Sequence, residues 1–219
     1  MTQIPAVFLF RLEYGCPFHA NMTLGQKDTL LSLPEEARID QRTKLVCPKP
    51  FADMRIAWNE EGLGVEVTVK GKHQELIGDQ NRPRLSDGLM LWIDTRDTRN
   101  IHRASRYCHQ FFFLPTGGGA EFDEPVAGQL PIHRAQQDAP QVNPDQIPYR
   151  CHRRKQGYRM EIFLSKAVLH GYDPETNRRL GFYYVVRDAE LGEQSLGLGA
   201  EFPYAEDPSL WSTLALNRD

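Results

Sequence analysis

Aromatic, basic and amide side chains that could bind a polar ligand gather between residues 92 and 110. Sugar sites lay an apolar ring face on an aromatic side chain while planar polar groups take the hydroxyls, so they combine Trp or Tyr with Arg, Asn, Gln or Asp. The candidate residues here are Trp92, Arg96, Asn100, His102, Arg103, Arg106 and Gln110. We predict that they form a ligand-binding rim, in which Trp92 stacks and the others supply hydrogen bonds or charge. Packing inside the sheet is the alternative role for Trp92.

Positive charge is concentrated in two separate stretches of the chain. The first contains Arg96, Arg99, His102, Arg103, Arg106 and His109, and the second contains Arg150, His152, Arg153, Arg154 and Lys155. If the two stretches lie side by side, they form a face that attracts carboxylates, sulfates, phosphates or an acidic protein partner. The alternative is a solvated surface on which these groups pair with carboxylates, namely Asp94, Asp97, Glu161 and Asp188.

Two Cys-His dipeptides, at residues 108–109 and 151–152, contain groups that can bind a metal or act as nucleophiles. Adjacent side chains of a strand face opposite ways, however, so the two members of one dipeptide cannot readily share a ligand. We therefore predict no catalytic residues and no metal ligands among them. Carboxylates that could bind calcium occur at Asp94, Asp97, Glu121, Asp123 and Glu124, but without a D-x-D-x-D-G loop. We predict no cofactor, with a structural calcium ion as the open alternative.

The composition indicates one soluble domain over residues 1–219. Hydrophobic residues make up 40% of the chain, which is enough for a core, and no apolar run is long enough to cross a bilayer. The net charge of -3 gives no reason to expect a nucleic-acid partner. The apolar run near the N-terminus lacks the flanks of a signal peptide, so we predict a cytoplasmic location with free thiols. A disulfide between Cys108 and Cys151 in an exported form is the alternative.

Apolar and polar residues alternate with a period of two along much of the chain, which is typical of strands with one face on a core. Strands are expected at residues 54–58, 63–69, 88–94, 106–114, 148–154, 158–164, 180–188 and 211–216. Both faces of the strands at 88–94 and 106–114 are largely apolar, so these two should be neighbours in the centre of a sheet. We expect one short helix at residues 166–170, a long loop at 115–148 with only short possible strands inside it, and a loop at 191–199.

Strands outnumber helices, and turn signals separate them. The predicted fold class is therefore all-β: a two-sheet antiparallel β-sandwich of jelly-roll or immunoglobulin-like shape, with one short helix and long loops.

Several short motifs in a fixed order give the chain a resemblance to a known family. They are Phe51 to Trp58 before a hairpin, Ser86-Asp87-Gly88 leading into Leu91 to Asp94, Tyr158 to Leu164, Leu180-Gly181-Phe182 with Arg187-Asp188, and Asp207 to Trp211. Over about residues 51–216 the chain resembles the carbohydrate-binding module family 9-like group, β-sandwiches related in shape to DOMON domains. The resemblance implies a non-catalytic domain that binds sugars with aromatic rings at a concave face or loop rim. Some relatives carry structural calcium.

The sequence thus predicts a non-catalytic binding module for a saccharide or anionic ligand, without a membrane partner. The identity of the ligand and the oligomeric state stay open. A protein-interaction or structural module that docks an acidic partner through the basic stretches is the alternative function. An enzyme would instead need a deep pocket that holds a titratable group with a shifted pKa next to Cys108 or His102.

Overall fold

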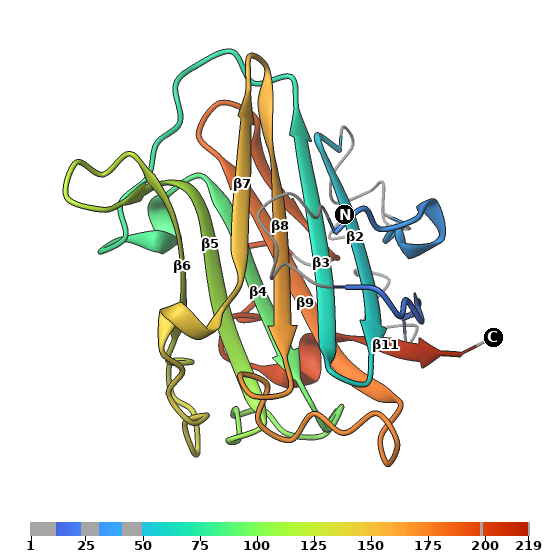
Figure 1. Cartoon of the computed structure of the whole chain (residues 1–219). Helices are drawn as coiled ribbons and strands as arrows, with labels where there is room; N and C mark the ends of the chain where they lie inside the picture. Colours follow the sequence, from blue (N-terminus) through green and yellow to red (C-terminus); the bar gives the residue numbers. More distant parts are fainter. Residues whose placement is uncertain (1–11, 23–30, 41–49, 198, 219) are drawn as a thin grey trace, which may run out of the picture.

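Two β-sheets packed face to face form the structure, a computed structural model that describes residues 12–22, 31–40, 50–197 and 199–218 (Figure 1). The larger sheet has the spatial order β1 (Glu13–Pro17), β11 (Ser212–Asn217), β9 (Arg179–Asp188), β4 (Gly88–Asp94), β5 (Cys108–Gly118) and β6 (Glu124–Leu130). Its seventh strand, β10 (Gly192–Ser195), pairs with the second half of β9. The smaller sheet has the order β2 (Ala52–Asn59), β3 (Gly62–Lys70), β8 (Gly157–Ser165) and β7 (Tyr149–Arg154).

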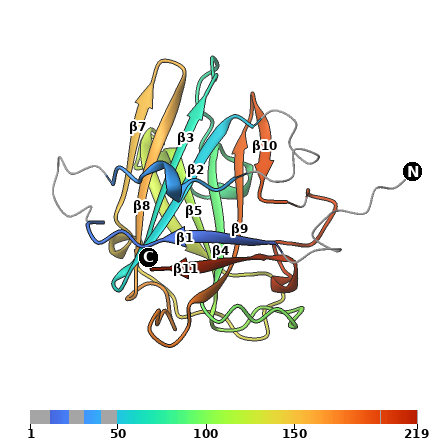
Figure 2. The same ribbon diagram turned by 90° about the vertical axis from the view of Figure 1, so that its right-hand side faces the viewer.

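Neighbouring strands of the described residues run antiparallel, except for the parallel pair β1 and β11. Figure 2 shows this parallel pair at one edge of the larger sheet, with β10 extending beside β9. Four 3-10 helices lie in the connections: η1 (Glu35–Ala37), η2 (Pro83–Leu85), η3 (Pro144–Gln146) and η4 (Pro208–Leu210). None of the described segments forms a helix long and apolar enough to cross a membrane.

The core lies between the two sheets and follows the predicted alternation. On β4, Leu89, Leu91 and Ile93 are fully buried, and on β3, Val65 and Val67 belong to the same apolar cluster. All seven residues of β4 are buried, so this strand is covered on both faces. It lies between β9 and β5, which confirms the prediction of two neighbouring central strands and of an all-β sandwich.

The predicted short helix at residues 166–170 is wrong. The amides of Val168 and Leu169 both donate to the Ser165 carbonyl at 3.0 Å, which closes a single turn. The chain leaves this turn at Gly171, whose φ of 85° lies in the left-handed region that favours glycine. The segment is therefore too short to add a second turn.

The predicted loops at 115–148 and 191–199 are also only partly correct. The first contains the end of β5, all of β6 and η3, and the second contains β10. The edge strand β6 begins with the exposed residues Glu124 and Pro125 and includes Gly128, so its sequence lacks the apolar alternation of a half-buried strand. β10 is four residues long, which gives the alternation little room to appear.

A buried ion triad fixes the long connection between β3 and β4. Lys72 Nζ lies 3.1 Å from Asp87 Oδ2 and 3.0 Å from Asp188 Oδ1, and all three side chains are at most 3% exposed. Burial alone would lower the pKa of Lys72, but its hydrogen bonds to Asp188 and Asp87 raise the pKa overall, so the ammonium stays charged. Asp87 also accepts from the amides of Ile77 at 3.0 Å and Ala189 at 2.7 Å. The triad therefore ties the connection to the end of β9.

We predict that the substitution Lys72→Met lowers the free energy of unfolding by about 3 to 5 kcal/mol, because it leaves two buried carboxylates without their cation. Urea denaturation at neutral pH measures this loss. The matched control is Lys70→Met, at the exposed lysine that ends β3, which should change stability by about 0.5 kcal/mol or less. Similar small effects of the two substitutions would contradict the role given to the triad.

Candidate ligand-binding site

An aromatic cluster covers the centre of the outer face of the larger sheet. The strand register places Trp92 of β4 beside Tyr183 of β9 on one side and Gln110 of β5 on the other. Tyr204, from the connection between β10 and β11, lies over them. Its ring stacks on Tyr183 with 4.6 Å between the centroids and meets Trp92 edge-on at 5.5 Å. Tyr204 is partly exposed, whereas Trp92 and Tyr183 are buried.

A hollow of about 160 Å³ opens beside Trp92 and Tyr204, and we call it the Tyr204 hollow. Its polar lining consists of Arg84, Arg187 and Glu193. Arg187 Nη1 donates to Glu193 Oε1 at 3.2 Å and to the Arg84 carbonyl at 3.3 Å. The hollow thus combines an aromatic ring with planar charged side chains, which are the groups that recognise sugar rings and hydroxyls.

Arg84 joins this hollow to two others on the same side of the molecule. Its side chain also lines a hollow beside residues 131–135 and Asp138, and another over η2 with Leu85 and Pro131. Arg84 is exposed, and its Nη2 donates to Gln110 Oε1 at 3.3 Å. The three hollows therefore form neighbouring parts of one uneven surface with Arg84 at their centre.

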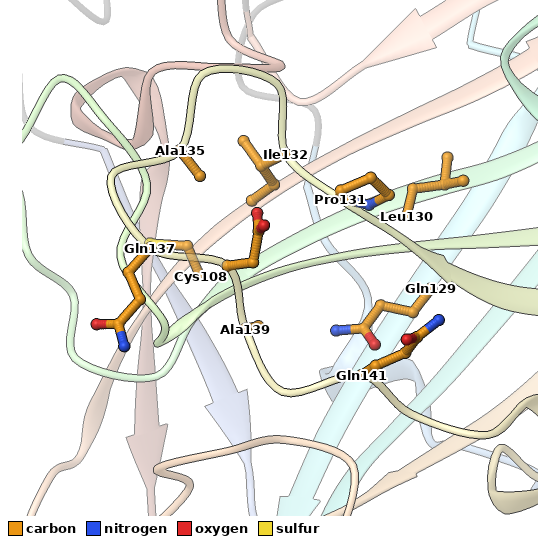
Figure 3. A pocket seen from close by; sticks show the side chains of 10 residues that line it. Cys108, Gln129, Leu130, Pro131, Ile132, Ala135, Gln137, Ala139 and Gln141 are labelled. Atoms are coloured by element: carbon orange, nitrogen blue, oxygen red, sulfur yellow. The ribbon is translucent and has the colours of Figure 1, made fainter.

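Another cavity, of about 240 Å³, lies beside Cys108 under the segment that follows β6 (Figure 3), and it shares four lining residues with the hollow beside residues 131–135. Figure 3 shows the amide side chains of Gln129, Gln137 and Gln141 around it. The Gln129 amide is already engaged, because it donates to the Pro140 carbonyl at 3.2 Å and accepts from the Val142 amide at 2.8 Å. None of the ten lining residues is aromatic, so this cavity offers no ring on which a sugar could stack. The Tyr204 hollow is therefore the better candidate site.

The structure brings together only two of the seven residues predicted to form the rim. Trp92 and Gln110 are direct neighbours on the outer face, and they are 3% and 0% exposed. Because Tyr204 and Tyr183 cover its ring, most of the surface of Trp92 serves packing, which was the alternative role. Arg84, rather than a residue of the predicted loop, donates the hydrogen bond to the Gln110 side chain.

Two further predicted residues, His102 and Arg103, brace the segments that border the site. His102 Nδ1 lies 3.0 Å from Asp207 Oδ2 and 3.2 Å from Ser209 Oγ. The Arg103 guanidinium donates to the carbonyls of Arg134 at 2.9 Å and Ala135 at 3.4 Å. These contacts connect the β4–β5 loop to the segments 131–135 and 199–210. His102 thus contacts the segment that carries Tyr204, and Arg103 contacts the segment 131–135.

The remaining predicted residues lie in the β4–β5 loop and do not line the Tyr204 hollow. The guanidinium groups of Arg96 and Arg106 lie 4.8 and 5.1 Å from the centroid of the Tyr107 ring. Asn100 is exposed in the same loop. This loop forms a second aromatic and basic patch, at one end of the sheet.

The two basic stretches do not lie side by side. The first precedes β5, which begins at Cys108, whereas Arg153 Nε donates to the Pro115 carbonyl near the other end of β5. Arg153 also donates to the Asp123 carbonyl. The stretches are separated because β7, which carries Arg153, meets β5 at the end away from Cys108. The two stretches therefore do not form the single anion-binding face that we considered for the case in which they lie side by side.

The first Cys-His dipeptide points its side chains to opposite faces, as predicted. Cys108 lies on the outer face, where burial and the Asp94 carboxylate raise the pKa of its thiol to about 12. A neutral thiol is a poor nucleophile, so Cys108 is not activated for catalysis. His109 lies in the core opposite Ile93, stacks on Phe111 at 5.9 Å and contacts the His170 carbonyl through Nε2 at 3.3 Å.

The other predicted groups have local roles. Cys16, Cys108 and Cys151 are free thiols, so the alternative disulfide is not formed, and Cys47 lies outside the described residues. The Asp94 carboxylate accepts from the amides of Arg96 at 2.9 Å and Thr98 at 2.6 Å. Among the described residues, no three His, Cys, Asp or Glu side chains are placed to share a metal ion.

Four residues of the Tyr204 hollow were missed from the sequence, namely Arg84, Arg187, Glu193 and Tyr204. Arg84 and Tyr204 lie in connections, where no periodic pattern indicates which side chains face the sheet. Arg187 and Glu193 are cross-strand partners on β9 and β10. Opposite charges on paired strands indicate cross-strand partners, but this signal can be used only once β9 and β10 are known to pair.

No protein-family model matches the sequence, and no curated protein matches it either. Among solved structures, the fold is similar to a family 9 carbohydrate-binding module from Caldicellulosiruptor kristjanssonii in complex with cellotriose, with a TM-score of 0.63, 13% identity and 95% of each chain covered. A family 9 module from the same organism in complex with glucose gives a TM-score of 0.55, 13% identity and 77% of each chain. A candidate carbohydrate-binding protein from Bacteroides uniformis gives 0.51, 10% and 84% of each chain. The predicted resemblance to the family 9 fold is confirmed.

The buried position of His109 predicts a dependence of stability on pH. Burial lowers the pKa of His109 to about 4, while the unfolded chain titrates near pH 6.5. Between pH 6.5 and about 4, His109 therefore binds a proton in the unfolded state but not in the folded state. Protonation stabilises the unfolded state, so the free energy of unfolding falls as the pH falls towards 4. We expect His109 to account for about 3 kcal/mol of this loss.

Urea denaturation between pH 7.5 and 4.5 tests this expectation. The variant His109→Phe should show a flatter decline than the unsubstituted protein, and the control His133→Phe, at an exposed histidine, should keep the full slope. An unchanged slope in the His109 variant would show that this residue does not stay neutral in the core.

Proposed function

We propose that the protein is a non-catalytic module that binds saccharides in the Tyr204 hollow. The observation that carries the proposal is a partly exposed tyrosine ring bordered by Arg84, Arg187 and Glu193 on the outer face of the larger sheet. The likeness in fold to modules whose structures contain cellotriose or glucose supports it.

Each group of the hollow has a role in such binding. The exposed part of Tyr204 offers an apolar face to the C–H groups of a sugar ring. The paired side chains of Arg187 and Glu193 present one donor and one acceptor to adjacent hydroxyls. Because cross-strand pairing and stacking hold these side chains before a ligand arrives, binding orders few additional groups.

The chemistry of the lining favours binding over catalysis. Glycosidases use two carboxyl groups on either side of the scissile bond, whereas the Tyr204 hollow is lined by one glutamate, which Arg187 holds. The neutral thiol of Cys108 gives no support to a covalent mechanism at the neighbouring cavity. His102 is mostly exposed and serves as a contact between loops.

Substitution of two comparable tyrosines tests the location of the site. We predict that Tyr204→Ala weakens saccharide binding at least tenfold, about 1.4 kcal/mol, because it removes the stacking ring. Tyr107→Ala, at a partly exposed tyrosine in the β4–β5 loop, should leave the affinity unchanged. A glycan array with neutral and acidic saccharides selects the probe, and isothermal titration calorimetry measures its affinity for both variants.

Two results would contradict the proposal. Loss of binding in Tyr107→Ala with normal binding in Tyr204→Ala would move the site to the loop that holds Arg96 and Arg106. Absence of binding across the neutral and acidic panels would remove saccharide recognition itself. Thermal unfolding of each variant shows whether a loss of affinity comes from a loss of fold.

A further inference from the structure

Arg84 is a cation without a carboxylate partner at the centre of the candidate site. Among the described residues it forms no salt bridge, in contrast to its neighbours Arg82, which pairs with Asp79 at 3.0 Å, and Arg187, which pairs with Glu193 at 3.2 Å. The acceptor that its guanidinium contacts is the amide oxygen of Gln110, at 3.3 Å. A guanidinium carries five N–H donors, so most of its capacity for hydrogen bonds stays free.

Two buried donors without partners belong to Gln110, which Arg84 contacts, and to its neighbour Trp92. Trp92 Nε1 and Gln110 Nε2 are shielded from solvent, and neither makes a hydrogen bond to a described residue. The two residues are direct cross-strand neighbours, and Trp92 lines the Tyr204 hollow. A buried donor without a partner costs about 1 to 3 kcal/mol, so an acceptor that reached these groups would gain that energy.

The site therefore offers more donors than acceptors. The amide oxygen of Gln110 accepts from Arg84 and Glu193 Oε1 accepts from Arg187, so Glu193 keeps one carboxylate oxygen for a ligand. Two arginines face one glutamate in the Tyr204 hollow, which leaves an excess of positive charge. Of the other carboxylates, Glu201 acts on the Tyr204 hydroxyl from outside the lining, and Asp138 belongs to the adjoining hollow, together with Arg134 and His133.

From this imbalance we infer that the site selects acidic saccharides, and that Arg84 binds the carboxylate of a uronic acid. The inference rests on the saccharide-binding function proposed above and specifies the class of sugar. A carboxylate is planar and accepts two parallel hydrogen bonds from a guanidinium, so it can bind the free N–H groups of Arg84. An ionised carboxylate has no hydrogen to donate and therefore needs no acceptor from the protein. Trp92 lines the same hollow, so its buried indole N–H is a further donor that a carboxylate held by Arg84 can approach.

The fold holds Arg84 in place for this role. Arg84 lies in the 3-10 helix η2, and its carbonyl accepts from Arg187 Nη1 at 3.3 Å. Two residues later, Ser86 closes the turn through hydrogen bonds from its hydroxyl to the carbonyls of Arg82 at 3.1 Å and Asp79 at 3.3 Å. The Lys72 triad then fixes Asp87. A backbone ordered in this way reduces the entropy that a bound anion would otherwise have to offset.

Matched pairs of monosaccharides that differ only at C6 test the inference. The probes are glucuronate with glucose and galacturonate with galactose, and glucuronamide serves as the uncharged analogue of the first acid. Titrations followed by 1H–15N NMR report the affinity and the indole N–H signal of Trp92, which the spectrum of Trp92→Phe assigns. We expect at least one acid to bind tenfold or more tightly than its neutral partner and its amide, with a downfield shift of the Trp92 indole proton.

The substitution Arg84→Gln should remove this preference, so that the acid binds no more tightly than its neutral partner and its amide. The matched control is Arg154→Gln, at an exposed arginine at the end of β7, which should keep the preference. A preference that survives Arg84→Gln would overturn the role of Arg84. Equal affinities for acids and neutral sugars would overturn the inference and leave the proposed function intact, whereas no binding by any of the five probes would overturn both. Thermal unfolding verifies that each variant is folded.

Discussion

The hydrogen-bonded register of β4 between β9 and β5 is the constraint on which the candidate site depends. It places Tyr183, Trp92 and Gln110 in one row across the outer face of the larger sheet. A shift of β4 by one residue would turn Trp92 into the core and expose Leu91 and Ile93, which are fully buried. The apolar alternation that builds the core therefore also fixes the floor of the site.

Contacts between distant segments bring the polar groups over this floor. The Lys72 triad fixes the connection that carries Arg84, and Trp211 Nε1 donates to the Tyr204 carbonyl at 2.8 Å. His102 holds the same segment through Asp207. The site is thus assembled from parts of the chain that are far apart in sequence, on a rigid sheet. Such an arrangement favours the recognition of a ligand by groups that are already in position.

The sequence predicted the strands better than the connections, because the two are governed by different physics. Alternation at 88–94 and 180–188 reports which face of a strand meets the core, and these strands are β4 and β9. It says nothing about Tyr204, whose place depends on a segment without periodicity, or about Arg84, which long-range ion pairs position. For the same reason, the predicted rim consisted of residues that are close in sequence. In the structure, Trp92 and Gln110 lie in the floor of the site, His102 and Arg103 contact neighbouring segments, and the other three residues lie in the β4–β5 loop. Only Trp92 and Gln110, which lie on strands, were correctly placed next to one another by their register.

A crystal structure of the protein grown with the best-bound oligosaccharide tests the central claim most directly, since it shows where the ligand lies without reliance on substitutions. The account predicts that one sugar ring lies against Tyr204, with its polar groups within hydrogen-bond distance of Arg84, Arg187 or Glu193. A sugar bound instead at the Tyr107 patch of the β4–β5 loop, or in the cavity beside Cys108, would contradict it.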